Sequence, residues 1–384
     1  MIRHLRIEGF KRFTDASFDF APLVVLTGLN GAGKTSLIQA LLLCRSAQDA
    51  RHGTVPLNGG RFELDLGTAE DIHNRKSTGD IVFSLEIRHP LTCDLEFPRG
   101  SPNVWRFAVP EDAPEALYVK IEECAEPDWI AFEPDLNLPA RAFTYLCAER
   151  LGPRSILSAS SVTDAELEVG THGELSAQVL AILGDRPMEH EDRLHPNRDA
   201  DAAPFLKYEL EAWLSEIVRP IQIETTAHAD GLFTALRFGT PGSELVSAPN
   251  MGFGVSYALP VVLAGLIAQR SGLLLVENPE AHLHPAGQSR VGVFLAWLAG
   301  RGVQVVVETH SDHVLNGIRR AIGEDGYLSS DDAIIHFFGS DDDDSCVTTP
   351  LRFTASGGVS DWPPGFFDQY QIDVAALGRI RRRP

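Results

Sequence analysis

One motif near the start of the chain restricts the possible folds more than any other feature. Residues 28–35 read Gly-Leu-Asn-Gly-Ala-Gly-Lys-Thr and follow an apolar run, Leu23 to Thr27. A helical pattern, Ser36 to Leu43, comes next. Glycines let a loop turn its backbone N–H groups toward phosphates, and a lysine adds positive charge. Together the strand, loop and helix predict a phosphate-binding loop in an α/β fold.

The residues expected to bind the phosphates are consecutive. They are Asn30, Gly31, Ala32, Gly33, Lys34, Thr35 and Ser36. The positive end of the following helix adds to the attraction for anions. The Thr35 hydroxyl is a ligand type for Mg²⁺, so the motif indicates that the chain binds a nucleoside triphosphate together with Mg²⁺.

Two later strands end in residues that suit the same site. Leu273 to Val276 is apolar and is followed by Glu277, which we expect to face Mg²⁺. Val303 to Val307 leads into Glu308-Thr309-His310-Ser311-Asp312, and His310 at such a strand end can reach a γ-phosphate.

The chain between these motifs divides into zones. Segments 81–88, 93–97, 104–109 and 116–122 are typical of antiparallel strands. Helical patterns at 256–268, 286–299 and 312–322 alternate with apolar strands, which predicts parallel pairing with crossover helices. The charged segment 185–202 is the best candidate for an insertion or a mobile lid.

Composition excludes several classes of protein. The net charge of −20 counts against a general nucleic-acid coat. No apolar run approaches the ~20 residues needed to span a bilayer, and the start of the chain lacks a signal-peptide layout. The five cysteines are scattered and form no C-x-x-C pair, which argues against a zinc ribbon or a disulfide framework. We therefore expect a cytoplasmic protein without a membrane partner.

The order of the motifs resembles that of a known family. The phosphate loop, the turn Gly252-Phe253-Gly254-Val255-Ser256, the acidic strand end and the strand-end histidine follow one another as in ABC-class P-loop ATPases, in particular the RecF/SMC-like and OLD-like group. The resemblance implies that Gly252, Gly254 and Ser256 bind nucleotide held by a second subunit. It also implies that ATP closes a head-to-tail homodimer, with His310 as the H-loop residue and Leu283-His284-Pro285 as the D-loop.

Further segments are similar to OLD-like ATPases. They are Lys11-Arg12-Phe13, Ala148 to Pro153 and Glu277 to Pro285, and Trp362 to Gln369 resembles a domain of unknown function found on some of them. The resemblance implies an ABC-type P-loop NTPase head over 1–339, with a mixed sheet, an antiparallel β subdomain and a helical insertion at about 152–220. Residues 340–384 would be a C-terminal extension packed on the head.

Three departures from the family pattern concern catalysis. Asn278 stands where most ABC ATPases have the glutamate that polarises water, and an amide cannot take a proton. Either Glu280 substitutes for it or hydrolysis is slow. Tyr257 follows Ser256 where glutamine is common. The Q-loop has only Gln48 and Asp71 as candidates.

The favoured function is an ATP-hydrolysing switch. Resemblance to OLD-like ATPases suggests a role in bacterial anti-phage defence or DNA repair, with DNA or RNA as a possible contact. About 60 residues follow the last ATPase helix, too few for a nuclease domain of typical size, so an effector such as a nuclease would be a separate chain. Asn278 favours the alternative, a nucleotide-gated scaffold with little turnover. The absence of L-S-G-G-Q argues against a transporter subunit, and intrinsic nuclease activity is a minor alternative.

Overall fold

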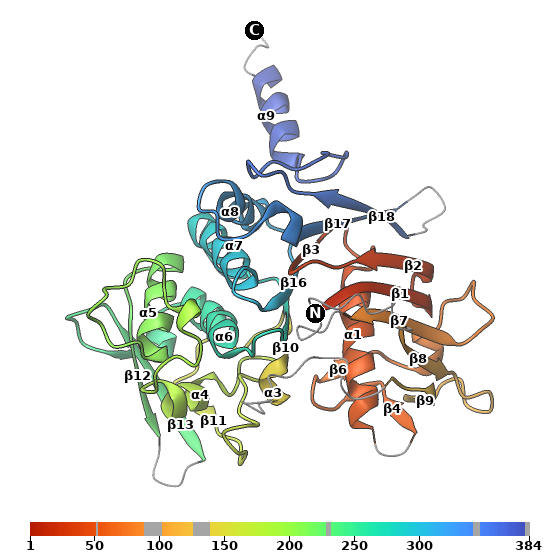
Figure 1. Cartoon of the computed structure of the whole chain (residues 1–384), viewed down its shortest axis with the longest axis horizontal. Helices are drawn as coiled ribbons and strands as arrows, with labels where there is room; N and C mark the ends of the chain where they lie inside the picture. Colours follow the sequence, from red (N-terminus) through yellow and green to blue (C-terminus); the bar gives the residue numbers. More distant parts are fainter. Residues whose placement is uncertain (51–52, 88–101, 126–138, 228–231, 341–345, 381–384) are drawn as a thin grey trace, which may run out of the picture.

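A mixed six-stranded sheet lies at the centre of the computed structural model (Figure 1). Its strands, in spatial order, are β10 (Phe143–Leu146), β15 (Leu273–Glu277), β16 (Gln304–Glu308), β3 (Leu23–Gly28), β17 (Ala333–Ser340) and β18 (Cys346–Arg352). All neighbours pair in parallel except β17 and β18. Every residue of β15 and β16 is buried, so both faces of the sheet are covered. This confirms the α/β class and the parallel pairing.

The structure describes residues 1–50, 53–87, 102–125, 139–227, 232–340 and 346–380. The predicted strand 93–97, the acidic run 341–344 and the arginines at 381–383 lie outside these ranges. Within them, the smaller elements are β5 (Asn58–Gly59), β6 (Leu64–Asp65), α2 (Ala69–Ile72), α3 (Pro139–Ala142), η4 (Ala248–Asn250), η5 (Ser330–Asp332) and α9 (Gln369–Ile380). Helix α9 projects from one end of the molecule (Figure 1).

An antiparallel sheet and one helix cover one side of the central sheet. The strands are β2 (Phe13–Asp19), β1 (Ile2–Phe10), β7 (Ile81–Ile87), β8 (Asn103–Ala108), β9 (Tyr118–Glu123) and β4 (Thr54–Pro56). Helix α1 (Lys34–Asp49) shares a hydrophobic core with this sheet and with β3. Strands predicted at 81–88, 104–109 and 116–122 are thereby confirmed, with small shifts at their ends.

A helical layer covers the other side. It contains α5 (Leu206–Ile217), α6 (Phe253–Ile267), α7 (Pro285–Ala299) and α8 (Asp312–Gly323). Helix α4 (Ser176–Leu183) and a small sheet of β11 (Ile156–Ser158), β13 (Phe233–Gly239), β12 (Gln222–Ala227) and β14 (Val246–Ser247) complete this half. The helices predicted at 256–268, 286–299 and 312–322 are confirmed.

The charged segment 185–202 packs on this helical layer. It contains a 3-10 helix, η3 (Glu191–Arg193). The buried Arg193 guanidinium donates to the Ala268 carbonyl just after α6. Arg301, just after α7, donates to the Asp192 carbonyl at 2.9 Å. The boundaries at 152, 220 and 340 stay predictions, although β18 extends the central sheet beyond residue 340.

Close packing of α7 against α8 depends on glycine. A Cβ atom on Gly317 would lie 1.9 Å from the Ser289 carbonyl oxygen. We expect Gly317→Ala to lower the free energy of unfolding by about 1–3 kcal/mol, because a backbone oxygen cannot move aside cheaply. Urea denaturation measures the change. Gly79→Ala is the matched control, since a Cβ there meets nothing within 4 Å. Equal losses in both variants would contradict the packing argument.

Candidate nucleotide and magnesium site

The phosphate loop leaves the carboxyl end of β3 in the middle of the central sheet. Gly28 has φ 125°, and a Cβ there would lie 2.1 Å from the Phe338 carbonyl oxygen of β17. Only glycine fits this close approach. The Leu29 amide donates to the same oxygen at 2.9 Å. The loop then turns into α1 at Lys34, so the predicted residues 30–36 form the loop and the first turn of the helix.

The lysine of the loop points inward. The Lys34 ammonium donates to the carbonyls of Gly28 at 3.1 Å and Leu29 at 2.7 Å. Burial lowers its pKa, although Glu308 opposes the shift. The Arg12 guanidinium donates to the Gly31 carbonyl at 2.5 Å and thereby braces the tip of the loop.

A cationic cavity adjoins the loop. Its volume is about 760 Å³, and Gly31 and Ser36 form part of its wall. The basic side chains that line it are Lys11, Arg12, His73, Arg75 and Lys76, and the two carboxylates in its wall are Asp15 and Asp71. This concentration of positive charge stands out in a chain with a net charge of −20 and suits an anionic ligand.

Two buried carboxylates face the loop from neighbouring strands. Glu277 and Glu308 are register partners at the ends of β15 and β16. The Thr35 hydroxyl lies 2.9 and 3.2 Å from the two carboxylate oxygens of Glu308. Tyr145 donates its hydroxyl to Glu277 at 3.0 Å. A hydroxyl and two carboxylates are hard oxygen donors, so this set fits Mg²⁺.

Glu308 is a site residue that the sequence analysis missed as a ligand. It was named only as part of the segment before His310, although it ends its strand as Glu277 does. Burial, and then the charge of Glu277, raises the pKa of Glu308 to about 7. Burial also raises the pKa of Glu277, while the bond from Tyr145 opposes that shift.

The predicted catalytic residues lie just beyond these carboxylates. The Asn278 amide N–H donates to the Glu308 carbonyl at 2.8 Å, and its backbone has φ 44°. Its side-chain oxygen is buried and has no hydrogen-bond partner within the described ranges. Both carboxylate oxygens of Glu280 accept hydrogen bonds from the H-loop. One accepts from the Thr309 hydroxyl at 2.8 Å and the other from the His310 amide at 2.9 Å. Partial burial, and then Lys34, lowers the pKa of His310, which favours its neutral form.

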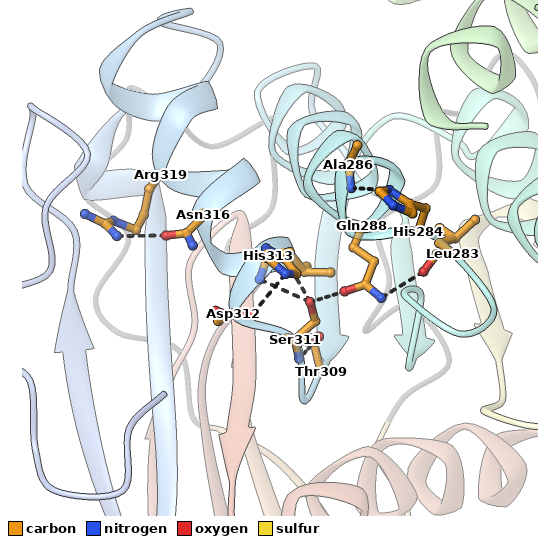
Figure 2. A network of polar contacts seen from close by, with 11 residues as sticks. Leu283, His284, Ala286, Gln288, Thr309, Ser311, Asp312, His313, Asn316 and Arg319 are labelled. Carbon is orange, nitrogen blue, oxygen red and sulfur yellow. Dashed lines mark hydrogen bonds and ion pairs between the residues drawn. The ribbon is translucent and has the colours of Figure 1, made fainter. Parts of the chain in front are cut away.

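A polar network joins the H-loop to the segment in the D-loop position (Figure 2). The Ser311 amide donates to the Thr309 hydroxyl at 3.1 Å, and the Ser311 hydroxyl donates to Gln288 at 2.6 Å. Gln288 in turn donates to the Leu283 carbonyl at 3.0 Å. Gln288 on α7 thus bridges the two loops by hydrogen bonds to both.

The glycine–serine turn forms the start of α6. Gly252 caps the helix with φ 88°, and Phe253 is 53% exposed. The Phe253 ring stacks on His282 with ring centroids 5.1 Å apart. The Ser256 hydroxyl, in contrast, is buried and has no hydrogen-bond partner among the residues the structure describes. The turn thus presents Gly252 and Phe253 outward, packs Gly254 against the loop at His282, and directs its serine hydroxyl inward.

Arg150 connects this turn to the end of β15. Its buried guanidinium donates to the carbonyls of Cys147 at 2.9 Å, Glu277 at 2.7 Å and Asn278 at 2.6 Å. It also lies over the Tyr257 ring, 5.5 Å from the centroid. The sequence signal for this residue was only its place in the segment 148–153. The Q-loop candidates lie elsewhere, Gln48 at the end of α1 and Asp71 in the cap of α2.

Replacement of Glu308 by glutamine tests the electrostatics of the site. A carboxyl whose pKa is raised from 4.5 to about 7 binds its proton more tightly in the folded state. Its contribution to stability is therefore fully present below pH 4.5 and is lost as the pH rises through 7. We expect the wild type to lose about 2–3 kcal/mol relative to Glu308→Gln between pH 5 and pH 8. Urea denaturation without nucleotide measures this difference, and parallel pH profiles would contradict it.

Three family models match the chain. Residues 161–316 match “AAA domain, putative AbiEii toxin, Type IV TA system”, residues 4–86 match “AAA domain”, and residues 328–377 match “Protein of unknown function (DUF3696)”. In the described part of the chain, no helix is long and apolar enough to cross a membrane.

Comparison with individual proteins gives two informative relatives. An OLD nuclease of Thermus scotoductus is 23% identical over 337 residues, which cover 81% of this chain and 59% of that protein. The chain therefore spans less than two thirds of that relative. A solved SMC head bound to the C-winged helix domain of ScpA matches with a TM-score of 0.52 and 13% identity, over 92% of this chain and 98% of that one. This second likeness concerns the fold.

These matches agree with the motif order and with the strand-end site. The chain thus contains segments of two AAA-domain families and of DUF3696, is similar to an OLD nuclease, and has the fold of an SMC head.

Proposed function

We propose that this protein binds and hydrolyses ATP with Mg²⁺ and that ATP closes a head-to-tail homodimer. The dimer acts as a switch for a separate effector chain in a DNA-linked process. The observation that carries the proposal is the convergence of three strand ends. The loop after β3, Glu308 on β16 and Glu277 on β15 meet at one edge of the sheet, where ligands of open parallel sheets bind.

Different residues would bind different parts of the nucleotide. Backbone N–H groups of the loop and Lys34 hold the phosphates, and the cationic cavity beside Gly31 and Ser36 receives the rest of the nucleotide. Thr35 and Glu277 would hold Mg²⁺, which when bound neutralises charge on the phosphates. His310, whose backbone amide donates to Glu280, would donate from its ring to a γ-phosphate.

The second subunit would complete the site through the start of α6. The helix start, with Gly252 exposed and Gly254 half-buried, would offer backbone N–H groups to a phosphate from another subunit. The Ser256 hydroxyl would have to rotate outward to join them, because it is buried here. Phe253 then lies at the subunit seam.

The biological role rests on the relatives. The matched relative is named an OLD nuclease, and the SMC head of similar fold was solved with a domain of another protein bound to it. Both are consistent with an ATPase that acts together with an effector, such as a nuclease, in anti-phage defence or DNA repair. The net charge of −20 limits DNA or RNA contacts to local patches.

Molecular mass and nucleotide binding test the switch together. With MgATP we expect the wild type to double in mass, because two subunits enclose two nucleotides. Lys34→Ala should lose ATP binding, whereas Phe253→Arg should bind ATP but stay monomeric. Tyr370→Arg, on the 75% exposed ring of α9, is the matched control and should dimerise. ATP binding without any change in wild-type mass would refute the head-to-tail dimer.

The scaffold alternative is favoured by Asn278. Its amide cannot act as a base, and Glu280 is occupied by Thr309 and His310. In a site that is slowed by this amide, Asn278→Glu should raise ATP turnover by about 10²-fold. Asn278→Gln is the control of equal length without the charge. Turnover that stays low in both variants would favour a nucleotide-gated scaffold, whereas ready turnover by the wild type would exclude it.

A further inference from the structure

The contact between Thr35 and Glu308 has a chemical consequence for the proposed magnesium site. A hydroxyl has one hydrogen and two lone pairs. Both oxygens of Glu308 lie within 3.2 Å of the Thr35 oxygen, and an ionised carboxylate only accepts hydrogen bonds. The hydroxyl hydrogen is therefore directed at Glu308, and the lone pairs of Thr35 remain available to a cation.

The hydroxyl of Thr35 bonds to Glu308 and not to the carbonyl that most often competes for it. A threonine in a helix often donates to the carbonyl four residues earlier, which here is Gly31. That carbonyl accepts a hydrogen bond from Arg12 at 2.5 Å instead. Glu308 on β16 thus orients the hydroxyl of Thr35 on α1. Among the described residues, this hydroxyl donates to Glu308 and to no residue of α1.

The charges around this contact favour a divalent cation. Glu277 and Glu308 are both buried and lie on neighbouring strands in register. The cations that act on them are Lys34 and Arg150, and each has other partners. Lys34 donates to carbonyls of the phosphate loop, and Arg150 donates to carbonyls at the end of β10 and beyond β15. When both are ionised, as a bound cation favours, these carboxylates place two negative charges beside the loop.

We propose that Glu308 is a positioning residue of the magnesium site. It orients the Thr35 hydroxyl toward the metal and adds a second negative charge beside Glu277. This inference rests on the proposed binding of MgATP. It predicts that Glu308 has a large effect on the Mg²⁺ concentration needed for nucleotide binding. The effect on nucleotide affinity without Mg²⁺ should be small.

Two titrations without turnover test this role. The affinity for a non-hydrolysable ATP analogue is measured with Mg²⁺ and with a chelator. For Glu308→Gln we expect the Mg²⁺ concentration for half-saturation to rise by about 10–100-fold, as for other outer-shell partners of metal ligands. Affinity in the chelator should stay equal or improve, because a negative charge near the phosphates is gone. That retained affinity also shows that the variant is folded.

A second measurement uses Mn²⁺ alone, followed by the electron paramagnetic resonance signal of the free ion. Mn²⁺ binding should weaken in Glu308→Gln and weaken less in Glu308→Asp, which keeps the charge but retracts from Thr35. Glu324→Gln is the matched control, a carboxylate 64% exposed at the end of α8, and should behave as the wild type.

The outcomes separate this inference from the proposed function. If Glu308→Gln shows wild-type dependence on both ions while the wild type binds MgATP, the role of Glu308 is refuted and nucleotide binding stands. If the wild type binds no nucleotide, the proposed function fails. Loss of Mn²⁺ binding in Glu308→Gln would still support a metal role for Glu308 in that case.

Discussion

The parallel register of β3, β16 and β15 is the constraint on which the site depends. Because these strands end at the same edge, the phosphate loop, Glu308 and Glu277 meet although 242 residues separate Thr35 from Glu277 in the sequence. The burial that stabilises this sheet also desolvates the two carboxylates and raises their pKa values. The stability of the core and the raised proton affinity of these two carboxylates therefore have the same physical origin.

Around this edge, polar side chains connect the loops that would move in an ATP-driven switch. Glu280 holds the H-loop through Thr309 and His310, and the chain from Ser311 to Gln288 continues to Leu283. Arg150 joins the backbone after β15 to Tyr257 on α6. The bond from the His310 amide to Glu280 is exposed, whereas the other links are partly or fully buried. Loss of a buried partner leaves a polar group unpaired, which costs more than the loss of an exposed one.

Much of the fold was predictable because its signals are local. The phosphate loop is marked by Gly28 and by Lys34 and Thr35 at the helix start. The apolar runs of β15 and β16 are typical of buried parallel strands. The antiparallel strands and the crossover helices were found for the same reason. Their ends shifted by a few residues, as in α6, which begins at Phe253 rather than at Ser256 because Gly252 caps it.

The sequence by itself determined the fold class, the phosphate loop and two of the strand-end residues, Glu277 and His310, because each depends on residue type and spacing within one segment. Tertiary structure decided which side chains meet. Glu308 contacts Thr35, Glu280 is bonded to the H-loop, Arg150 clamps the end of β15, and the Ser256 hydroxyl is buried. These facts depend on strand order, register and side-chain packing between segments that lie from about 30 to 273 residues apart. The spacing of residues along the chain does not reveal these contacts.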